Sequence, residues 1–183
     1  EGVPRWRWTM AELIRLTEMG VFTAEDRIEL IGGEIVPMSP IGRRHEVVAE
    51  DIVEAWRDRV PADLRIMTER QLQLAEDTYT KPDIWVRPKA IRGPDVRGDT
   101  VLLIVEVADT SLAFDKTKKA SVYAQHGVRE YWVVDAQTLV TTVHRGPGRA
   151  GYADVATFTP EQALAPLSVP QLAVRLSELD LGD

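Results

Sequence analysis

The segment covering residues 101–135 constrains the fold of this chain most, because it predicts a strand, a loop, a helix and a second strand in succession. Residues 101–107 form an aliphatic run, which is typical of a central strand buried on both faces. A helix is expected over 115–126, with Gly127 at its C-terminal cap, followed by a strand over 130–135. A unit of this length predicts two parallel strands joined by a right-handed crossover.

Glu106 is the one charged residue in the first of these strands and lies near its C-terminal end. A buried charge is costly unless it is paired or binds a metal ion. Two interpretations follow from this position. Glu106 is either a salt-bridged residue with a structural role, or part of a functional site, where buried ionisable groups are often found.

The composition is that of an ordinary globular protein: 183 residues, 44% of them hydrophobic, with no cysteine and a formal net charge of −7. We expect one domain over 1–183, with a helical extension (1–26), a core (27–145) and a closing hairpin strand and tail (146–183). The absence of cysteine excludes disulfides and thiolate zinc sites and fits the cytoplasm. No apolar run approaches the roughly 20 residues of a membrane-spanning helix. The negative charge disfavours a general nucleic-acid coat protein, but it leaves room for a local basic face.

Three further elements can be predicted before the central unit. Thr9 and Glu12 form a capping box, so a short helix should begin there. Paired glycines between two β-rich runs predict a hairpin over 27–39. An apolar residue at every fourth position predicts an amphipathic helix over 43–60. Strands are also expected at 64–67, 69–74 and 84–86, with a second hairpin around 146–148 and an irregular tail.

Asp83 follows Pro82 and lies at the start of the predicted strand over 84–86, whereas Glu106 ends the next predicted strand. Carboxylates from neighbouring strands can share a hard divalent cation such as Mg²⁺ or Mn²⁺. Such an ion polarises a phosphoryl oxygen and activates a bound water. A nearby lysine could orient that water and stabilise the charge that develops on the phosphate.

Helix geometry limits which lysine can serve this purpose. Lys119 lies four residues before Tyr123, so both side chains share one face of the predicted helix. Lys116 lies on much the same face one turn earlier, whereas Lys118 is rotated away by about 100°. Lys119 is therefore the expected partner of the acids, provided that Tyr123 packs towards the sheet.

Several motifs together resemble one protein family. The runs ELIGGEIVPMSP, KPDIWV and VEVADTSLAFDKTKKASVYAQHGVREYWVVD, with His45 between the first two, closely resemble the Uma2 family (DUF820) of restriction-endonuclease-like proteins. The resemblance covers about residues 28–145. It implies the PD-(D/E)xK nuclease superfamily and an α/β fold with a mixed sheet, in which a restriction-endonuclease-like core of α-β-β-β-α-β order carries an extra N-terminal helix and hairpin.

The resemblance also implies site residues. Asp83 and Glu106 match the two metal-binding acids, and Lys119 matches a lysine that this family places on the helix. Glu34 and His45 match recurring family positions and are expected to support the site. The superfamily's standard motif has its lysine two residues after the second acid, where this chain has Ala108. Catalysis would therefore depend on Lys119 reaching the site from the helix.

The leading hypothesis is a Mg²⁺- or Mn²⁺-dependent endonuclease that hydrolyses DNA. The expected phosphate contacts are Arg43, Arg44, Lys116, Lys118 and the basic loop over 87–97. Two alternatives remain open: a phosphodiesterase that acts on RNA, and a binding or assembly module that keeps the fold without turnover, which the net charge and Ala108 favour. We also expect a homodimer, for which the N-terminal helix offers an interface.

Overall fold

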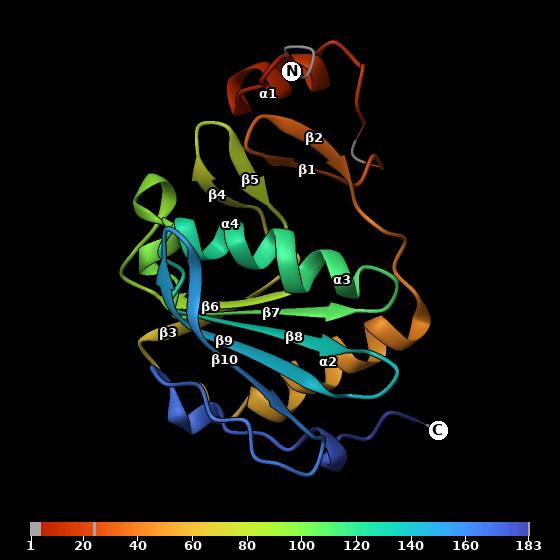
Figure 1. Cartoon of the computed structure of the whole chain (residues 1–183), viewed down its shortest axis with the longest axis vertical. Helices are drawn as coiled ribbons and strands as arrows, with labels where there is room; N and C mark the ends of the chain where they lie inside the picture. The colour runs from red at the N-terminus through yellow and green to blue at the C-terminus, as the bar shows by residue number, and fades with distance from the viewer. Residues whose placement is uncertain (1–4, 24, 183) are drawn as a thin grey trace.

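The computed structural model describes residues 5–23 and 25–182, and its strands form two sheets (Figure 1). The four-stranded sheet has the order β2-β1-β5-β4, and the six-stranded sheet has the order β10-β9-β8-β7-β6-β3. The small sheet consists of β1 (Ile28–Ile31), β2 (Glu34–Pro37), β4 (Leu72–Ala75) and β5 (Thr78–Thr80). The large sheet consists of β3 (Leu64–Thr68), β6 (Ile84–Pro88), β7 (Leu103–Ala108), β8 (Glu130–Asp135), β9 (Thr141–Gly148) and β10 (Gly151–Phe158).

The described residues form fewer α-helices than strands. The main ones are α1 (Met10–Glu18), α2 (Arg43–Trp56), α3 (Leu112–Phe114) and α4 (Ala120–Gln125), with a π-helical segment, η3 (Asp115–Lys119), between the last two. Short 3₁₀ turns lie at Gly93–Asp95, Gly98–Thr100, Pro170–Leu172 and Leu176–Glu178. Every helix in the described ranges is too short or too polar to cross a bilayer.

The predicted core order is confirmed by α2, β3, β6, β7, the α3–η3–α4 helix and β8. Strand β6 pairs antiparallel with both β3 and β7, whereas β8 pairs with β7 in parallel. The helix between β7 and β8 supplies the crossover that a parallel pair requires. The C-terminal end of β7 therefore opens into the loop that leads to this helix.

The large sheet is covered on both faces (Figure 1). One face packs on α2 and the C-terminal tail, through a core that includes Trp56, Val105 and Leu172. The other face packs on α4 and the small sheet, through Ile104 and Tyr123. Because side chains alternate along a strand, Glu106 points to the same face as Ile104, towards α4 and the small sheet.

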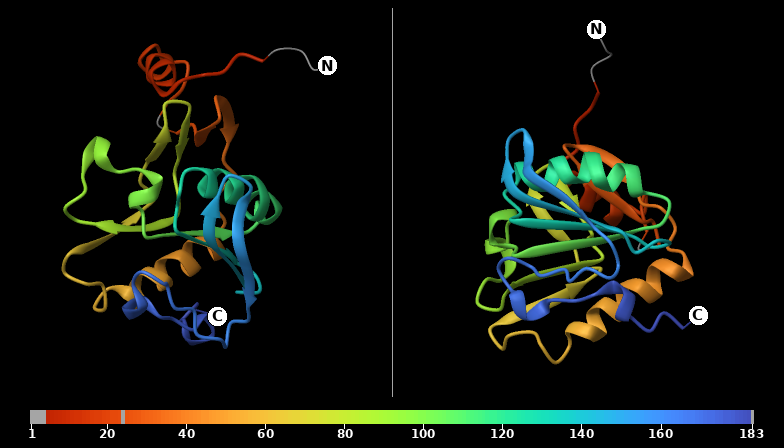
Figure 2. Two further views of the ribbon diagram at one scale, coloured as in Figure 1. Left: turned by 60° about the vertical axis from the view of Figure 1, so that its left-hand side comes forward. Right: turned by 60° about the horizontal axis from the view of Figure 1, so that its bottom comes forward.

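Helix α1 begins as its capping box predicts. The Thr9 hydroxyl accepts a hydrogen bond from the Glu12 backbone N–H, and the Glu12 carboxylate accepts one from the Thr9 backbone N–H. Leu13 packs with Leu30 and Tyr79 of the small sheet. Figure 2 shows α1 on the side of the small sheet that faces away from the large sheet.

Three predicted boundaries were wrong. Helix α2 ends at Trp56, four residues before the predicted end. The strand expected over 69–74 begins only at Leu72, because Glu69 has a φ of 47° and separates β3 from β4. The second hairpin turns at residues 149–150, because Pro147 and Gly148 still pair with β10.

Glu130 connects β8, β9 and the tail. Its buried carboxylate accepts hydrogen bonds from the Trp132 indole at 2.8 Å, from the Arg145 guanidinium at 2.8 and 3.0 Å, and from the Leu167 backbone N–H at 2.7 Å. Loss of one partner from a buried ion pair leaves the other charge uncompensated and typically costs about 3–5 kcal/mol.

We therefore predict that Glu130→Ala lowers the free energy of unfolding by about 3 kcal/mol or more in urea denaturation. Glu178→Ala, which removes the exposed pair with Arg175, is the control and should cost less than about 1 kcal/mol. Equal stability of the two variants would contradict the anchoring role of Glu130.

Candidate functional site

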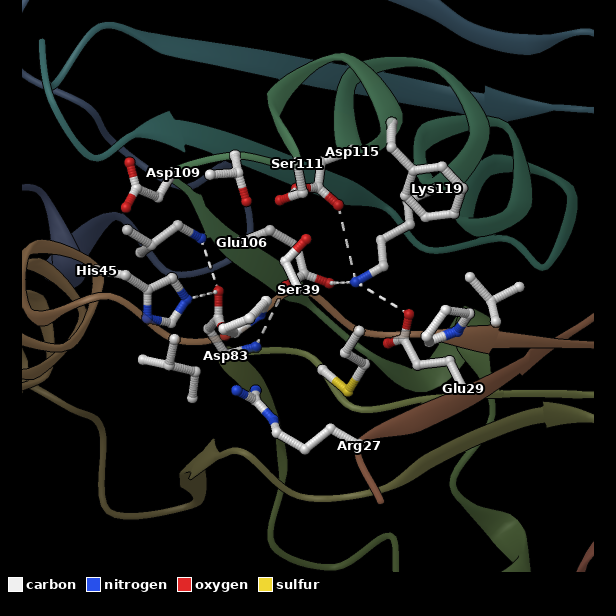
Figure 3. Close-up of a pocket in the computed structure, with 18 residues that line it drawn as sticks. Arg27, Glu29, Ser39, His45, Asp83, Glu106, Asp109, Ser111, Asp115 and Lys119 are labelled. Atoms are coloured by element: carbon white, nitrogen blue, oxygen red, sulfur yellow. Dashed lines mark hydrogen bonds and ion pairs between the residues drawn. The ribbon is translucent and has the colours of Figure 1, made fainter. Parts of the chain in front are cut away.

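A pocket of about 260 Å³ lies beside the C-terminal end of β7 (Figure 3). Its walls come from the β1–β2 hairpin and the segment after it, the first turn of α2, the residue before β6, and the loop and η3 segment after β7. Side chains from distant parts of the chain therefore meet at this edge of the large sheet. Its polar lining includes Glu29, His45, Asp83, Glu106, Asp115 and Lys119.

Asp83 and Glu106 lie side by side, as their positions at adjoining strand ends predicted. The pairing of Ile84 with Val105 places one acid just before β6 and the other next to it on β7. The Asp83 carboxylate accepts a hydrogen bond from the Val107 backbone N–H at 2.8 Å, and the Asp83 N–H lies 3.4 Å from the Glu106 carboxylate. The backbone of β7 thus fixes the separation of the two acids.

Lys119 reaches these acids from the helix side. Its ammonium lies 3.0 Å from Glu106 Oε1, 3.2 Å from Glu29 Oε2 and 3.8 Å from Asp115 Oδ1. Tyr123 donates a hydrogen bond to the same Glu106 oxygen at 2.9 Å, so both side chains share the face that the four-residue spacing predicted. Ala108, which occupies the standard lysine position, is part of the buried core.

The π-helical segment η3 contains both Asp115 and Lys119. The Ala120 N–H bonds to the Asp115 carbonyl, five residues earlier instead of four, which makes this turn wider than an α-helical turn. Such segments are rare and are frequent at functional sites. The Tyr131 hydroxyl from β8 also donates to the Asp115 carbonyl, at 3.2 Å, and supports the widened turn.

His45 also lies in the pocket. It comes from the first turn of α2, and its Nε2 lies 3.0 Å from Asp83 Oδ2. Burial lowers the pKa of His45, but the hydrogen bond to Asp83 and the charge of that carboxylate outweigh burial, so the pKa is raised overall. His45 therefore contacts the same Asp83 oxygen, Oδ2, that accepts the Val107 N–H.

The site carries more negative than positive charge. Glu29, Asp83, Glu106 and Asp115 are each between 2% and 8% exposed, and Lys119 is the buried cation among them. Burial raises the pKa of Glu106 well above its usual value, with Lys119 opposing this shift and the other three acids adding to it. This surplus of carboxylate favours the binding of a cation.

Lys119 remains protonated in this setting. Burial alone would lower its pKa, but the charges of Glu106, Glu29 and Asp115 outweigh that effect and raise the pKa above its usual value. A lysine held in this way is a fixed positive charge and a hydrogen-bond donor. It is not a general base.

Glu34 does not lie in this pocket, contrary to the sequence-based expectation. It is partly exposed and lies 3.6 Å from Arg5 and 3.8 Å from Arg7. Glu29 occupies the position in the pocket that was expected for Glu34. Ile31 pairs with Glu34 and Glu29 pairs with Val36, so the two acids share one face of the hairpin but stand two residues, or about 7 Å, apart along it.

Alternation along β1 could have identified Glu29. Glu29 shares a face with Ile31, which packs into the core between the sheets, so a charge at position 29 interrupts an apolar face. This is the same signal that identified Glu106 in β7.

The expected phosphate contacts divide into two groups. The loop over 87–97 follows the end of β6 that is remote from Asp83, and Figure 1 shows it on the left, away from the C-terminal end of β7. Its Arg87 is buried and donates to the backbone carbonyls of Pro88 and Ile91, so its role is structural. Of the four single residues expected, Arg43 and Lys118 are exposed, Lys116 is half-buried, and Arg44 donates to the Ala136 carbonyl.

The fit of a metal ion can be tested on the chemistry of these donors. Within residues 5–23 and 25–182, no three histidine or acidic side chains are arranged to hold a metal ion together. Mg²⁺ does not require such a set, because it keeps several waters and usually binds through one or two carboxylates together with substrate phosphate. Asp83 and Glu106 fit that two-carboxylate pattern.

Comparisons with known proteins identify the fold and the family of this chain. A solved structure titled "putative nuclease belonging to DUF820" from Anabaena variabilis has 19% identity and a TM-score of 0.69, over 94% of this chain and 96% of that one. The fold is thus restriction-endonuclease-like. The model of the Uma2 family, described as "Putative restriction endonuclease", matches residues 10–178, and the chain belongs to that family. No curated protein matches.

The buried lysine generates a stability prediction. Lys119→Met should lower the free energy of unfolding by about 3–5 kcal/mol in urea with EDTA, because it leaves several buried carboxylates without their cation. Lys118→Met is the matched control one residue away on the exposed face and should change stability by less than about 0.5 kcal/mol. Similar losses in both variants would contradict the central position of Lys119.

Proposed function

We propose that this protein is a Mg²⁺- or Mn²⁺-dependent endonuclease that hydrolyses phosphodiester bonds in DNA. The single observation that carries the proposal is the buried group of Asp83, Glu106 and Lys119 in a pocket at the end of β7. Membership of a family described as a putative restriction endonuclease supports it.

Asp83 and Glu106 would hold the ion. When bound there, it would polarise a phosphoryl oxygen and lower the pKa of a bound water. Before any substrate arrives, the Val107 N–H and His45 already orient Asp83, while Lys119 and Tyr123 orient Glu106. The protein thus fixes the directions of both carboxylates in advance.

Lys119 would stabilise the negative charge that develops on the phosphate in the transition state. Its charge is maintained by Glu29 and Asp115, which act on the substrate only through the lysine and are therefore positioning residues. The exposed Arg43 and the half-buried Lys116 would contact phosphates that flank the cleaved bond.

Cleavage of single- and double-stranded DNA and RNA with Mg²⁺, Mn²⁺ or EDTA tests the proposal. We expect metal-dependent cleavage of DNA that falls at least about 100-fold in Asp83→Asn, Glu106→Gln and Lys119→Met. Folded, metal-binding protein without cleavage would contradict the activity. Preferential cleavage of RNA would support the same mechanism but show that the substrate is RNA instead of DNA.

The pocket predicts different roles for two acids of one hairpin. Glu29→Gln should lower kcat about tenfold or more with little change in KM, because it removes a carboxylate that holds the Lys119 ammonium. Glu34→Gln, the matched control at the partly exposed position, should leave both constants unchanged. Equal effects of the two substitutions would show that the pocket assignment is wrong.

The alternative is a protein that keeps this fold but does not cleave nucleic acid, and one observation favours it. A net charge of −7 is unusual for an enzyme that acts on a polyanion, and it favours an assembly module that keeps the fold. The retained acid–acid–lysine group disfavours this, since buried charges without a function are costly. The cleavage assay separates the two.

A homodimer formed through α1 remains part of the proposal. Ile14, Met19 and Val21 in and after α1 are 47%, 77% and 56% exposed, which is high for apolar side chains. We expect a concentration-dependent dimer in sedimentation velocity that Met19→Glu weakens. A wild-type protein that stays monomeric at all concentrations would contradict it.

A further inference from the structure

Arg27 is a cation in the same pocket that the proposed mechanism does not use. It directly precedes β1, and its carbonyl accepts a hydrogen bond from the Met38 N–H at 2.8 Å, which fixes its backbone against the other wall of the hairpin. The side chain is half-buried and lines the pocket. Figure 3 shows the guanidinium extending from β1 towards Asp83, on the side of that acid away from Lys119.

The guanidinium has no protein partner in the described part of the chain, where it makes neither a hydrogen bond nor an ion pair. This is unusual in a pocket with four buried carboxylates, because a guanidinium has five N–H donors and commonly binds a carboxylate through two of them. Lys119, the buried cation of the pocket, has the opposite arrangement. Lys119 has two carboxylates within hydrogen-bonding distance and a third at 3.8 Å.

We propose that Arg27 binds the non-bridging oxygens of a phosphate in the bound nucleic-acid strand, on the Asp83 side of the pocket. The inference rests on the proposed function and adds a substrate-binding residue to it. The fork of the guanidinium matches two oxygens of a phosphate, which a lysine ammonium cannot match as a point charge. The positive charge of Arg27 would also offset part of the repulsion that the acids exert on the substrate backbone.

Binding can be measured separately from cleavage. The probe is a short fluorescein-labelled DNA of mixed sequence, single-stranded or as a duplex, titrated by anisotropy with Ca²⁺ in place of Mg²⁺ at several salt concentrations. We expect Arg27→Ala to weaken binding about tenfold and to reduce the salt slope by about one phosphate contact. Arg27→Lys should keep the salt slope and recover only part of the affinity, because it retains the charge without the fork.

Arg149→Ala is the matched control. This arginine is exposed at the β9–β10 turn, beyond Arg145, at the end of the sheet opposite the pocket, and its removal changes the net charge equally. It should leave affinity close to that of the wild type. The Arg27 proposal is overturned if Arg27→Ala binds as tightly as Arg149→Ala, or if the folded wild-type protein binds neither form of the probe.

The same proteins in Mg²⁺ or Mn²⁺ separate this proposal from the proposed activity. Arg27-dependent binding without any cleavage would support the phosphate contact and reject hydrolysis. Cleavage by the wild type with an unchanged KM in Arg27→Ala would support hydrolysis and reject the contact. A raised KM with a nearly unchanged kcat in that variant supports both.

Discussion

The ion pairs of Lys119 are the interaction on which the arrangement of this protein depends. The ammonium comes from the crossover helix, Glu106 from the centre of the large sheet and Glu29 from the small sheet, so one charge joins three parts of the fold. Glu29 also accepts a hydrogen bond from the Lys81 N–H at 2.9 Å. Lys81 lies in the short segment that connects β5 of the small sheet to Asp83. Buried charge of this kind contributes little net stability and is costly to break. Its concentration at one pocket therefore points to function.

The lysine reaches the pocket by a different route from the one that the standard motif uses. Ala108 lies two residues after Glu106 in the same strand, so both side chains point to the same face of the sheet. A lysine at position 108 would therefore enter the pocket from the strand. Here the widened η3 turn presents Lys119 from the helix that covers this face, and the short side chain of Ala108 leaves room within the core. The same charge thus occupies the site from a different element.

The sequence predicted the parts of the structure that follow from local patterns. The aliphatic run around Glu106 predicted β7, and Pro82 placed Asp83 at the start of β6. Spacing along the helix selected Lys119 over Lys118. What it could not predict depends on register and on distance through space. Alternation along β1 marks Glu29 as a charge on an apolar face, but Glu34 lies on the same face of the hairpin. The packing of that hairpin against η3 decides which of the two carboxylates reaches the lysine. The distance between the basic loop over 87–97 and Asp83 could not be predicted for a related reason, because it depends on the direction of β6.

Metal binding is the central claim of this account, and calorimetric titration of Mn²⁺ into the protein tests it most directly. The account predicts binding by the wild-type protein that is lost when Asp83→Asn and Glu106→Gln are combined, and retained when Glu34→Gln is introduced instead. Circular dichroism would confirm that each variant is folded. Unchanged Mn²⁺ binding by the folded double variant, or none by the wild type, would contradict the assignment of Asp83 and Glu106 as the metal-binding pair.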